Sequence, residues 1–189
     1  MSLRYTKRWV RPMSAFCTLL TLIVMSAHTA HAATHSSIKS LATDTVIALQ
    51  ADNGLYLSRI NYGGTNGTNP IEAAKSTIDD YSKFKIVRQG NGNFTLQADN
   101  GLYLSRINYG GASGTNPIEA AKKTVDPYSQ FTIMLFLANG KIALQADNGL
   151  YLSRINHGGT NGTNPIEAAK TTADPYSQFT LTIVSQPTP

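Results

Sequence analysis

Three near-identical stretches of the sequence each carry a polar set that could bind a sugar. The set consists of an arginine, an asparagine two residues later, and an aromatic residue or histidine directly after it, and a glycine-rich stretch follows. An aromatic ring can stack on the apolar C–H face of a sugar, while amide and guanidinium groups donate hydrogen bonds to its hydroxyls. The nine candidate residues are Arg59, Asn61, Tyr62, Arg106, Asn108, Tyr109, Arg154, Asn156 and His157.

The same residues also have a structural interpretation. The arginines could pair with Asp52 or Glu72 and their equivalents and so close the repeats, and the tyrosines could cover their own loops. We favour the structural interpretation for the arginines. For the tyrosine and histidine position both interpretations stay open, because the first two copies are identical over residues 49–64 and 96–111. A recent duplication reproduces residues without a function as faithfully as functional ones, so the repetition does not decide between the two interpretations.

Catalysis and metal binding find little support in the residues. His157 is the one histidine within the repeats, and its counterparts are tyrosines, which does not indicate a Ser-His-Asp arrangement. The repeated Asp-Asn-Gly lacks the remaining ligands of a calcium loop. Threefold repetition should separate the three repeated glutamates, Glu72, Glu119 and Glu167, rather than pair them as acid and base. We therefore expect no enzymatic activity, no catalytic residue, no bound metal and no cofactor.

The first 32 residues have the three parts of a secretory signal peptide. Four basic residues and no acidic one precede residue 13, an apolar run covers residues 13–27, and Ala30-His31-Ala32 predicts cleavage after Ala32. This segment holds the only Cys, the only Trp and four of the 16 Lys and Arg residues, leaving 12 basic against 11 acidic residues. The net charge of +5 and the pI of 9.4 are therefore no evidence for nucleic-acid binding. We expect a secreted or periplasmic protein with no membrane insertion after cleavage.

The remaining chain is a triplication. The segment LQADNGLYLSRIN begins at Leu49, Leu96 and Leu144, which gives spacings of 47 and 48 residues. Apolar and polar residues alternate on both sides of each Asn-Gly, which predicts a hairpin whose two turn residues have positive φ. Four short strands in each of three repeats give twelve strands, the number in a β-trefoil, which closes on itself with three units.

One segment of each repeat is ambiguous. Residues 69–75, Asn-Pro-Ile-Glu-Ala-Ala-Lys, offer the signals of a helix start, yet they could equally form a strand with Ile71 and Ala73 on one face. The runs PYSQFTI at 127–133, ANGKIAL at 138–144 and DNGLYLSR at 147–154 resemble the repeat of fascin-like β-trefoil domains, in this case of a secreted bacterial type. This resemblance covers residues 46–184, implies a strand at the ambiguous segment, and implies binding to actin or another filament.

These observations predict an all-β protein with pseudo-threefold symmetry. A signal peptide (1–32) and a flexible leader (33–45) precede a β-trefoil (46–186) with repeats at 46–92, 93–140 and 141–186. The expected function is non-catalytic, multivalent, lectin-like recognition of carbohydrate through the repeated loops, by a monomer. The expected partner is a glycan or a cell-surface or filament ligand. The alternatives are fascin-like filament binding and a structural or inhibitory scaffold. Ricin-type lectins carry Gln-x-Trp in each repeat, which this chain lacks after residue 32.

Overall fold

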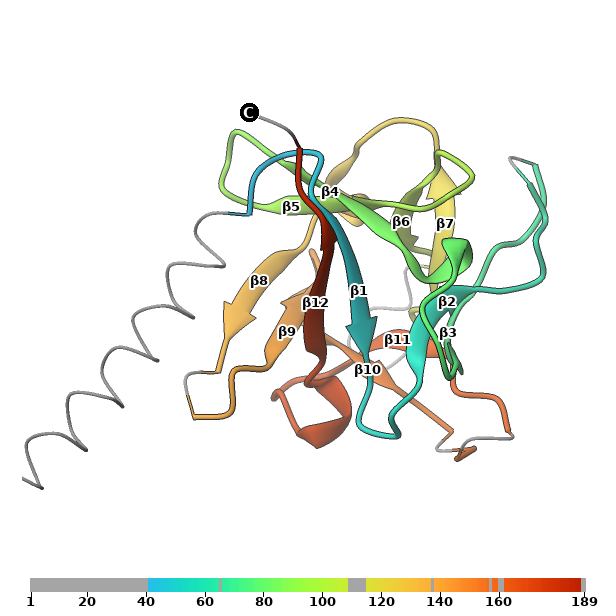
Figure 1. Cartoon of the computed structure of the whole chain (residues 1–189), viewed down its shortest axis with the longest axis vertical. Coiled ribbons are helices and arrows are strands. Elements are labelled where there is room, and N and C mark those ends of the chain that lie inside the picture. Colours follow the sequence, from blue (N-terminus) through green and yellow to red (C-terminus); the bar gives the residue numbers. More distant parts are fainter. Residues whose placement is uncertain are drawn as a thin grey trace, which may run out of the picture.

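The computed structural model describes residues 41–64, 66–108, 115–136, 138–156, 158–159 and 162–187. The predicted signal peptide, Tyr109 and His157 lie outside these ranges, as do residues 33–40 of the predicted leader. The strands fall into three groups of four, and each group has one short 3₁₀ turn before its last strand (Figure 1). The elements are β1 (Val46–Gln50), β2 (Tyr56–Arg59), β3 (Ile71–Lys75), η1 (Asp80–Ser82), β4 (Phe84–Arg88), β5 (Phe94–Gln97), β6 (Tyr103–Arg106), β7 (Ile118–Lys122), η2 (Pro127–Ser129), β8 (Thr132–Leu135), β9 (Ile142–Gln145), β10 (Tyr151–Arg154), β11 (Ile166–Lys170), η3 (Pro175–Ser177) and β12 (Thr180–Ser185).

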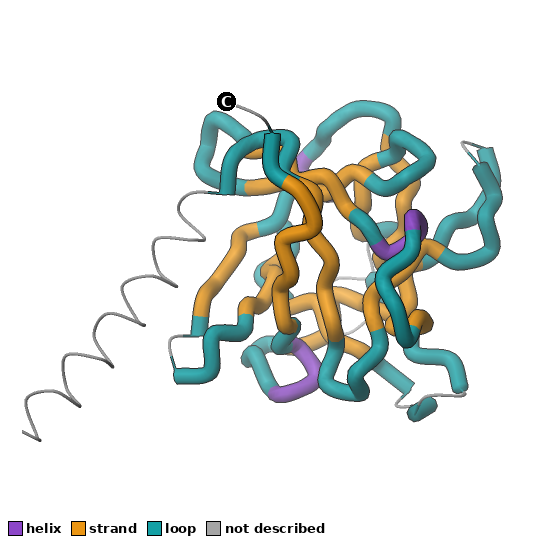
Figure 2. The backbone as a smooth tube through the Cα atoms, viewed as in Figure 1, coloured by secondary structure: helices purple, strands orange, loops and turns teal. Residues whose placement is uncertain are grey.

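Six of the strands close a ring. Antiparallel ladders join β1 to β4 and β12, β4 to β5, and β8 to β9. The bridges Phe94↔Phe131 and Ile142↔Phe179 join the start of β5 to that of β8 and the start of β9 to that of β12. The ring therefore runs β1-β4-β5-β8-β9-β12 and returns to β1, and Figure 2 shows these strands around a common interior. Closure gives hydrogen-bond partners to backbone groups that would be unpaired at the edges of an open sheet.

The other six strands form three hairpins, β2–β3, β6–β7 and β10–β11. Backbone hydrogen bonds of 2.9–3.0 Å connect each hairpin to another one, from Ala73 N to Asn164 O, from Ala120 N to Asn69 O and from Ala168 N to Asn116 O. The ambiguous Ile-Glu-Ala-Ala-Lys segment is a strand in all three repeats, so the strand prediction is confirmed and the helix alternative is excluded. Pairing between repeats overrides the local helix-start signal.

The Asn-Gly hairpins exist, but the predicted turn geometry is wrong. Gly54 has φ +80°, whereas Asn53 is not among the residues with positive φ. Gly54 N donates to Ala51 O at 3.0 Å, and Ala51 N donates to Leu55 O at 2.9 Å. This is a three-residue loop whose glycine takes the left-handed position, the second common solution for a short hairpin.

The core follows the period of two that the sequence shows. A phenylalanine at the start of the last strand of each repeat is at most 1% exposed, and buried leucine, isoleucine and alanine from the other strands surround these rings. The phenylalanines are Phe84, Phe131 and Phe179. Leu41, within the predicted flexible leader, is 2% exposed and belongs to the core cluster, and Asp44 N donates to Ile86 O. Residues 41–45 are therefore packed against the ring.

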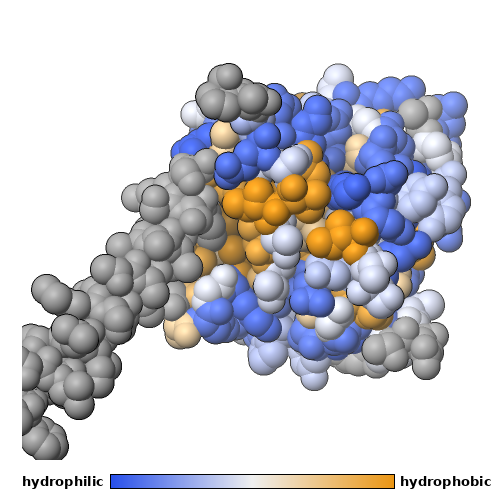
Figure 3. Space-filling model, in the orientation of Figure 1, coloured by the Kyte–Doolittle hydropathy of each residue, from blue (hydrophilic) through white to orange (hydrophobic). Residues whose placement is uncertain are grey.

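The last strands of the repeats share their buried phenylalanine but differ in their outer residues. Arg88 of β4 corresponds to Leu135 of β8 and to Ile183 of β12. Ile183 and Val184 are each 39% exposed, and Figure 3 shows apolar areas on this face among largely hydrophilic surroundings. The surface near these strands is thus where the three copies have diverged most.

Candidate binding grooves between the repeats

The three arginines of the predicted set link the repeats into a cycle. Arg154 donates through Nε and Nη2 to the two carboxylate oxygens of Asp52, at 2.8 and 2.6 Å. Arg59 and Arg106 hold Asp99 and Asp147 in the same way, so each arginine pairs with the aspartate of the next repeat. The arginines are 4–5% exposed. This is the pairing with aspartate that the structural interpretation proposed, made across repeats.

Arg59 and Arg154 each also fix a glycine-rich loop through an asparagine, Asn69 or Asn164. Arg59 Nη1 donates to Asn69 Oδ1 at 2.8 Å, and Asn69 Nδ2 donates to the carbonyls of Gly64 and Gly67. The hydrogen bond to Asp99 raises the pKa of Arg59, and that to Asp52 raises the pKa of Arg154. A buried guanidinium that stays charged and donates three hydrogen bonds, as those of Arg59 and Arg154 do, is a fixed structural element.

The asparagines of the set adopt a left-handed backbone conformation. Asn61, Asn108 and Asn156 have φ of 64–65°, the left-handed region that asparagine enters more readily than most residues. All three are exposed.

Gly63 is fixed by a close approach within its loop. Its carbonyl accepts from Gly67 N at 2.8 Å, and a Cβ on Gly63 would lie 2.5 Å from Thr68 O. We expect Gly63→Ala to lower the free energy of unfolding by about 1–3 kcal/mol, measured by urea denaturation. Gly90→Ala is the control, because a Cβ there meets no atom within 4 Å. Equal midpoints for the two variants would contradict this account of the loop.

Tyr62 is the one member of the predicted aromatic position that the structure describes. Its side chain is exposed, and its ring lies 4.4 Å from that of Tyr81, centroid to centroid. The Arg59 guanidinium lies 5.5 Å from the Tyr62 ring and 5.4 Å from the Tyr81 ring. Tyr62 and Tyr81 therefore form one aromatic surface, in which Tyr81 is the less exposed ring.

Tyr81 belongs to a second repeated set that our sequence analysis did not select. Tyr128 and Tyr176 occupy the same position in η2 and η3, and each ring lies 5.4–5.5 Å from the guanidinium of its own repeat. The signal was present as the recurring Tyr-Ser-x-Phe, which entered the sequence analysis only as part of the fascin-like resemblance.

Two grooves lie where one repeat meets the next. The first groove, of about 780 Å³, lies between η1, β4 and the β5–β6 turn, and its lining includes Asp79, Tyr81, Lys83, Lys85, Gln97 and Asp99. The second groove, of about 400 Å³, lies between η2, β8 and the β9–β10 turn, and its lining includes Asn91, Pro127, Gln130, Thr132, Gln145 and Asp147. Positions 83, 85, 97 and 99 of the first groove correspond to 130, 132, 145 and 147 of the second, so the two are symmetry equivalents. At the third position the corresponding residues are Gln178, Thr180, Gln50 and Asp52.

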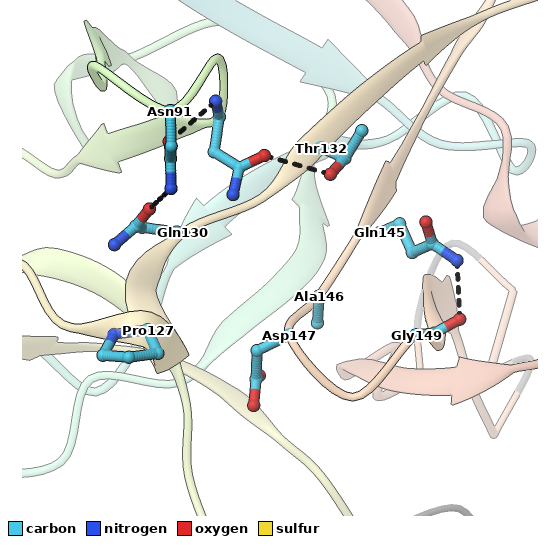
Figure 4. A pocket seen from close by; sticks show the side chains of 9 residues that line it. Asn91, Pro127, Gln130, Thr132, Gln145, Ala146, Asp147 and Gly149 are labelled. Carbon is cyan, nitrogen blue, oxygen red and sulfur yellow. Dashed lines mark hydrogen bonds between the residues drawn. The ribbon is translucent and has the colours of Figure 1, made fainter.

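The grooves present fixed polar groups. In the second groove Gln145 Nε2 donates to Gly149 O at 2.8 Å, and the side chain of Asp147, held by Arg106, keeps 20% of its surface exposed. Figure 4 shows Gln145, Asp147 and Gly149 on one side of this groove and Asn91, Gln130 and Pro127 on the other. Such an arrangement offers carboxylate and amide acceptors that need no reorganisation when a ligand arrives.

The aspartates that cap the 3₁₀ turns support the groove walls. Asp79 accepts from Ser82 N and pairs with Lys75 Nζ at 3.0 Å, and Asp126 and Asp174 make the equivalent contacts. Burial alone would raise the pKa of Asp79, but the hydrogen bonds from Ser82 and Lys75 outweigh it and lower that pKa below its ordinary value of 3.8. The pKa values of Asp126 and Asp174 are lowered as well.

These lowered pKa values predict loss of stability in acid. The unfolded chain takes up protons on these aspartates more readily than the folded one, so their contribution is present above the unfolded pKa and is lost as the pH falls through the folded pKa. We expect the melting temperature to fall below about pH 4. Replacing Asp79, Asp126 and Asp174 by asparagine should lower stability at pH 7 and flatten the decline in acid, because asparagine keeps the cap but cannot titrate. An unchanged slope in thermal melts from pH 5 to 2 would contradict the assignment.

The described residues contain no group of three or more His, Cys, Asp or Glu side chains placed to hold a metal ion. No helix in the described part of the chain is long and apolar enough to span a membrane.

Solved structures identify the architecture. A designed threefold-symmetric protein, ThreeFoil, matches with a TM-score of 0.62 and 22% identity over 72% of this chain and 96% of its own. The chain is a β-trefoil. The Rhizoctonia solani agglutinin matches the trefoil with a TM-score of 0.60 and 17% identity over 74% of this chain and 95% of its own. A Polyporus squamosus lectin, solved with a Neu5Ac-containing epitope, matches with a TM-score of 0.63 and 13% identity over 76% of this chain and 50% of its own.

No protein-family model and no curated protein matches this chain. The fascin-like resemblance within the trefoil class therefore stays a prediction.

Proposed function

We propose that this trefoil is an exported, non-catalytic carbohydrate-binding module that holds sugars in the grooves between its repeats. The observation that carries the proposal is the combination of the Tyr81 ring, the fixed Asp99 and Gln97 in the lining of the first groove. The same three residue types stand at the equivalent positions of the other repeats. The proposed export rests on the N-terminal signal pattern of residues 1–32.

The first groove shows how these groups could meet a sugar. Tyr81 lines it and is 36% exposed, so part of its ring is open to an apolar sugar face. Asp99 lies in the same lining, with both oxygens oriented by Arg59 and 21% of its side-chain surface still accessible. A carboxylate held in this way can accept hydrogen bonds from two neighbouring hydroxyls.

The proposed site lies in the grooves between the repeats and not at the tips of the glycine-rich loops, where the sequence predicted it. Arg59 and its equivalents are committed to the ring of ion pairs, and Asn61 and its equivalents hold a left-handed backbone. Tyr62 contributes through its contact with Tyr81 at the edge of the first groove. The presence of lectins among the structural neighbours supports sugar binding as a use to which this architecture is put.

A glycan microarray probed with the secreted chain tests the proposal. We expect binding to a restricted set of glycans, and no binding at high protein concentration would overturn it. A protein that bound no glycan but pelleted with F-actin at low salt would support the filament-binding alternative instead.

A further inference from the structure

The three groove positions differ in charge, although the repeats around them are nearly identical. The aspartate, the glutamine beside it and the tyrosine are common to all three positions. Four other positions differ as a group. At the first groove they are Asp44, Asp80, Lys83 and Lys85, at the second Asn91, Pro127, Gln130 and Thr132, and at the third Asn139, Pro175, Gln178 and Thr180.

At these four positions the second and third sites have a bond between neutral amides in place of charge. The third position also has Lys141 where the first two have Val46 and Asn93. Asn91 Nδ2 donates to Gln130 Oε1 at 2.8 Å, and Asn139 Nδ2 donates to Gln178 Oε1 at 2.9 Å. Thr132 Oγ1 adds a hydrogen bond to Asn93 Oδ1 at 3.2 Å (Figure 4). The wall of the second groove offers hydroxyl and amide groups, which suit the hydroxyls of a neutral sugar.

The first groove has two lysine side chains whose acidic partners are exposed to solvent. Lys83 Nζ pairs with Asp80 at 2.8 Å, but the side chain of Asp80 is 84% exposed. Lys85 Nζ lies 3.6 Å from Asp44, beyond hydrogen-bonding distance, and the side chain of Asp44 is 60% exposed. Exposed pairs of this kind are worth at most about 1 kcal/mol and are screened by salt.

An anionic group entering the first groove can therefore replace these rim carboxylates at little cost. The lysine ammonium groups have three donors each and flexible stems, so they can turn to a ligand while Asp44 and Asp80 return to water. The other two cations near this groove, Arg59 and Lys75, are held by Asp99 and Asp79 and have equivalents at every position. Lys83 and Lys85 are what distinguishes the first groove.

We propose that the first groove binds a saccharide carrying a carboxylate or sulfate group, whereas the second groove binds a neutral saccharide. This inference rests on the proposed carbohydrate-binding function. Tyr81 and Asp99 hold the sugar ring as their equivalents do elsewhere, and the two lysines add recognition of the anion.

Exchanging residues between equivalent groove positions provides the test variants. Lys83→Gln with Lys85→Thr gives the first groove the residues of the second, and Gln130→Lys with Thr132→Lys does the reverse. Both pairs of replacements already occur at equivalent positions of this fold, and urea denaturation checks that the variants fold. The control, Lys123→Gln, removes a positive charge from a residue that lines neither groove. Each protein is applied to an array of neutral, uronate-bearing, sialylated and sulfated glycans at 50 and 300 mM salt.

We expect the wild-type chain to bind both neutral and acidic glycans. The first variant should lose at least tenfold in binding to acidic glycans and keep its neutral ones, the reverse variant should gain acidic binding, and the control should match wild type. Acidic binding should also weaken at the higher salt. Neutral binding alone, or acidic binding that survives Lys83→Gln with Lys85→Thr, would overturn this inference and leave the proposed function standing. Absence of all glycan binding would overturn both.

Discussion

Replacing Arg154 by methionine is expected to lower the free energy of unfolding by about 2–4 kcal/mol. The change removes the paired hydrogen bonds to Asp52, 102 residues away in the chain, and leaves that carboxylate, only 19% exposed, without its partner. It also removes the donor to the buried Asn164 Oδ1. Urea denaturation followed by circular dichroism measures the loss.

Lys170→Met is the matched control in the same repeat. It breaks the 3.2 Å pair with Asp174, whose two side chains are 39% and 27% exposed, and should cost no more than about 0.5 kcal/mol. Arg154→Lys should fall between the two, because lysine keeps the charge but cannot make the bidentate contact. Equal unfolding midpoints for Arg154→Met and Lys170→Met would show that the ring of ion pairs does not hold the repeats together.

Replacing Tyr81, which lines the first groove, together with its equivalents Tyr128 and Tyr176 is expected to weaken binding to a glycan-coated surface by about 10²–10⁴-fold, beyond the effect of any single replacement. Three weak sites on one rigid body gain avidity on a repetitive surface, so the loss compounds when Tyr81, Tyr128 and Tyr176 all become alanine. Surface plasmon resonance on an immobilised glycan identified by the array measures it.

A second set of three tyrosines provides the control for this variant. Tyr56, Tyr103 and Tyr151 are also repeated once per unit, and none of them lines either groove. Their combined replacement by alanine should leave glycan binding within about threefold of wild type, provided that circular dichroism shows a folded protein. Equal losses in the two triple variants would place the site elsewhere.

Much of the fold could be predicted from the sequence, because repetition multiplies weak local signals. The 47- and 48-residue spacings and the alternation around each Asn-Gly predict the twelve strands that form. The strand at Ile71–Lys75 could not be decided locally, since Asn69-Pro70 favours a helix start. It is a strand because Ala73 N reaches Asn164 O of another repeat, a contact that no local signal encodes.

The site was harder to predict for a related reason. Near-identical repeats make a contact within one copy indistinguishable in sequence from a contact with the next, so the pairing of Arg59 with Asp99 rather than Asp52 is visible only in the closed ring. The grooves combine residues of two repeats. Tyr81 and its equivalents lie on three-residue turns, which are too short to give a periodic signal. The Arg-Asn-Tyr set was noticeable because its residues lie close together in the sequence. Its arginine and asparagine have structural roles, in an ion pair and in a left-handed backbone conformation.

The most direct test of groove binding is a map of where a bound saccharide perturbs the protein, by amide chemical shifts in NMR. With an acidic glycan identified by the array, we expect the largest shifts around Tyr81, Gln97 and Asp99, and with a neutral one around Gln145 and Asp147 of the second groove. Shifts confined to the glycine-rich loops after Asn61, with the groove residues unmoved, would contradict it.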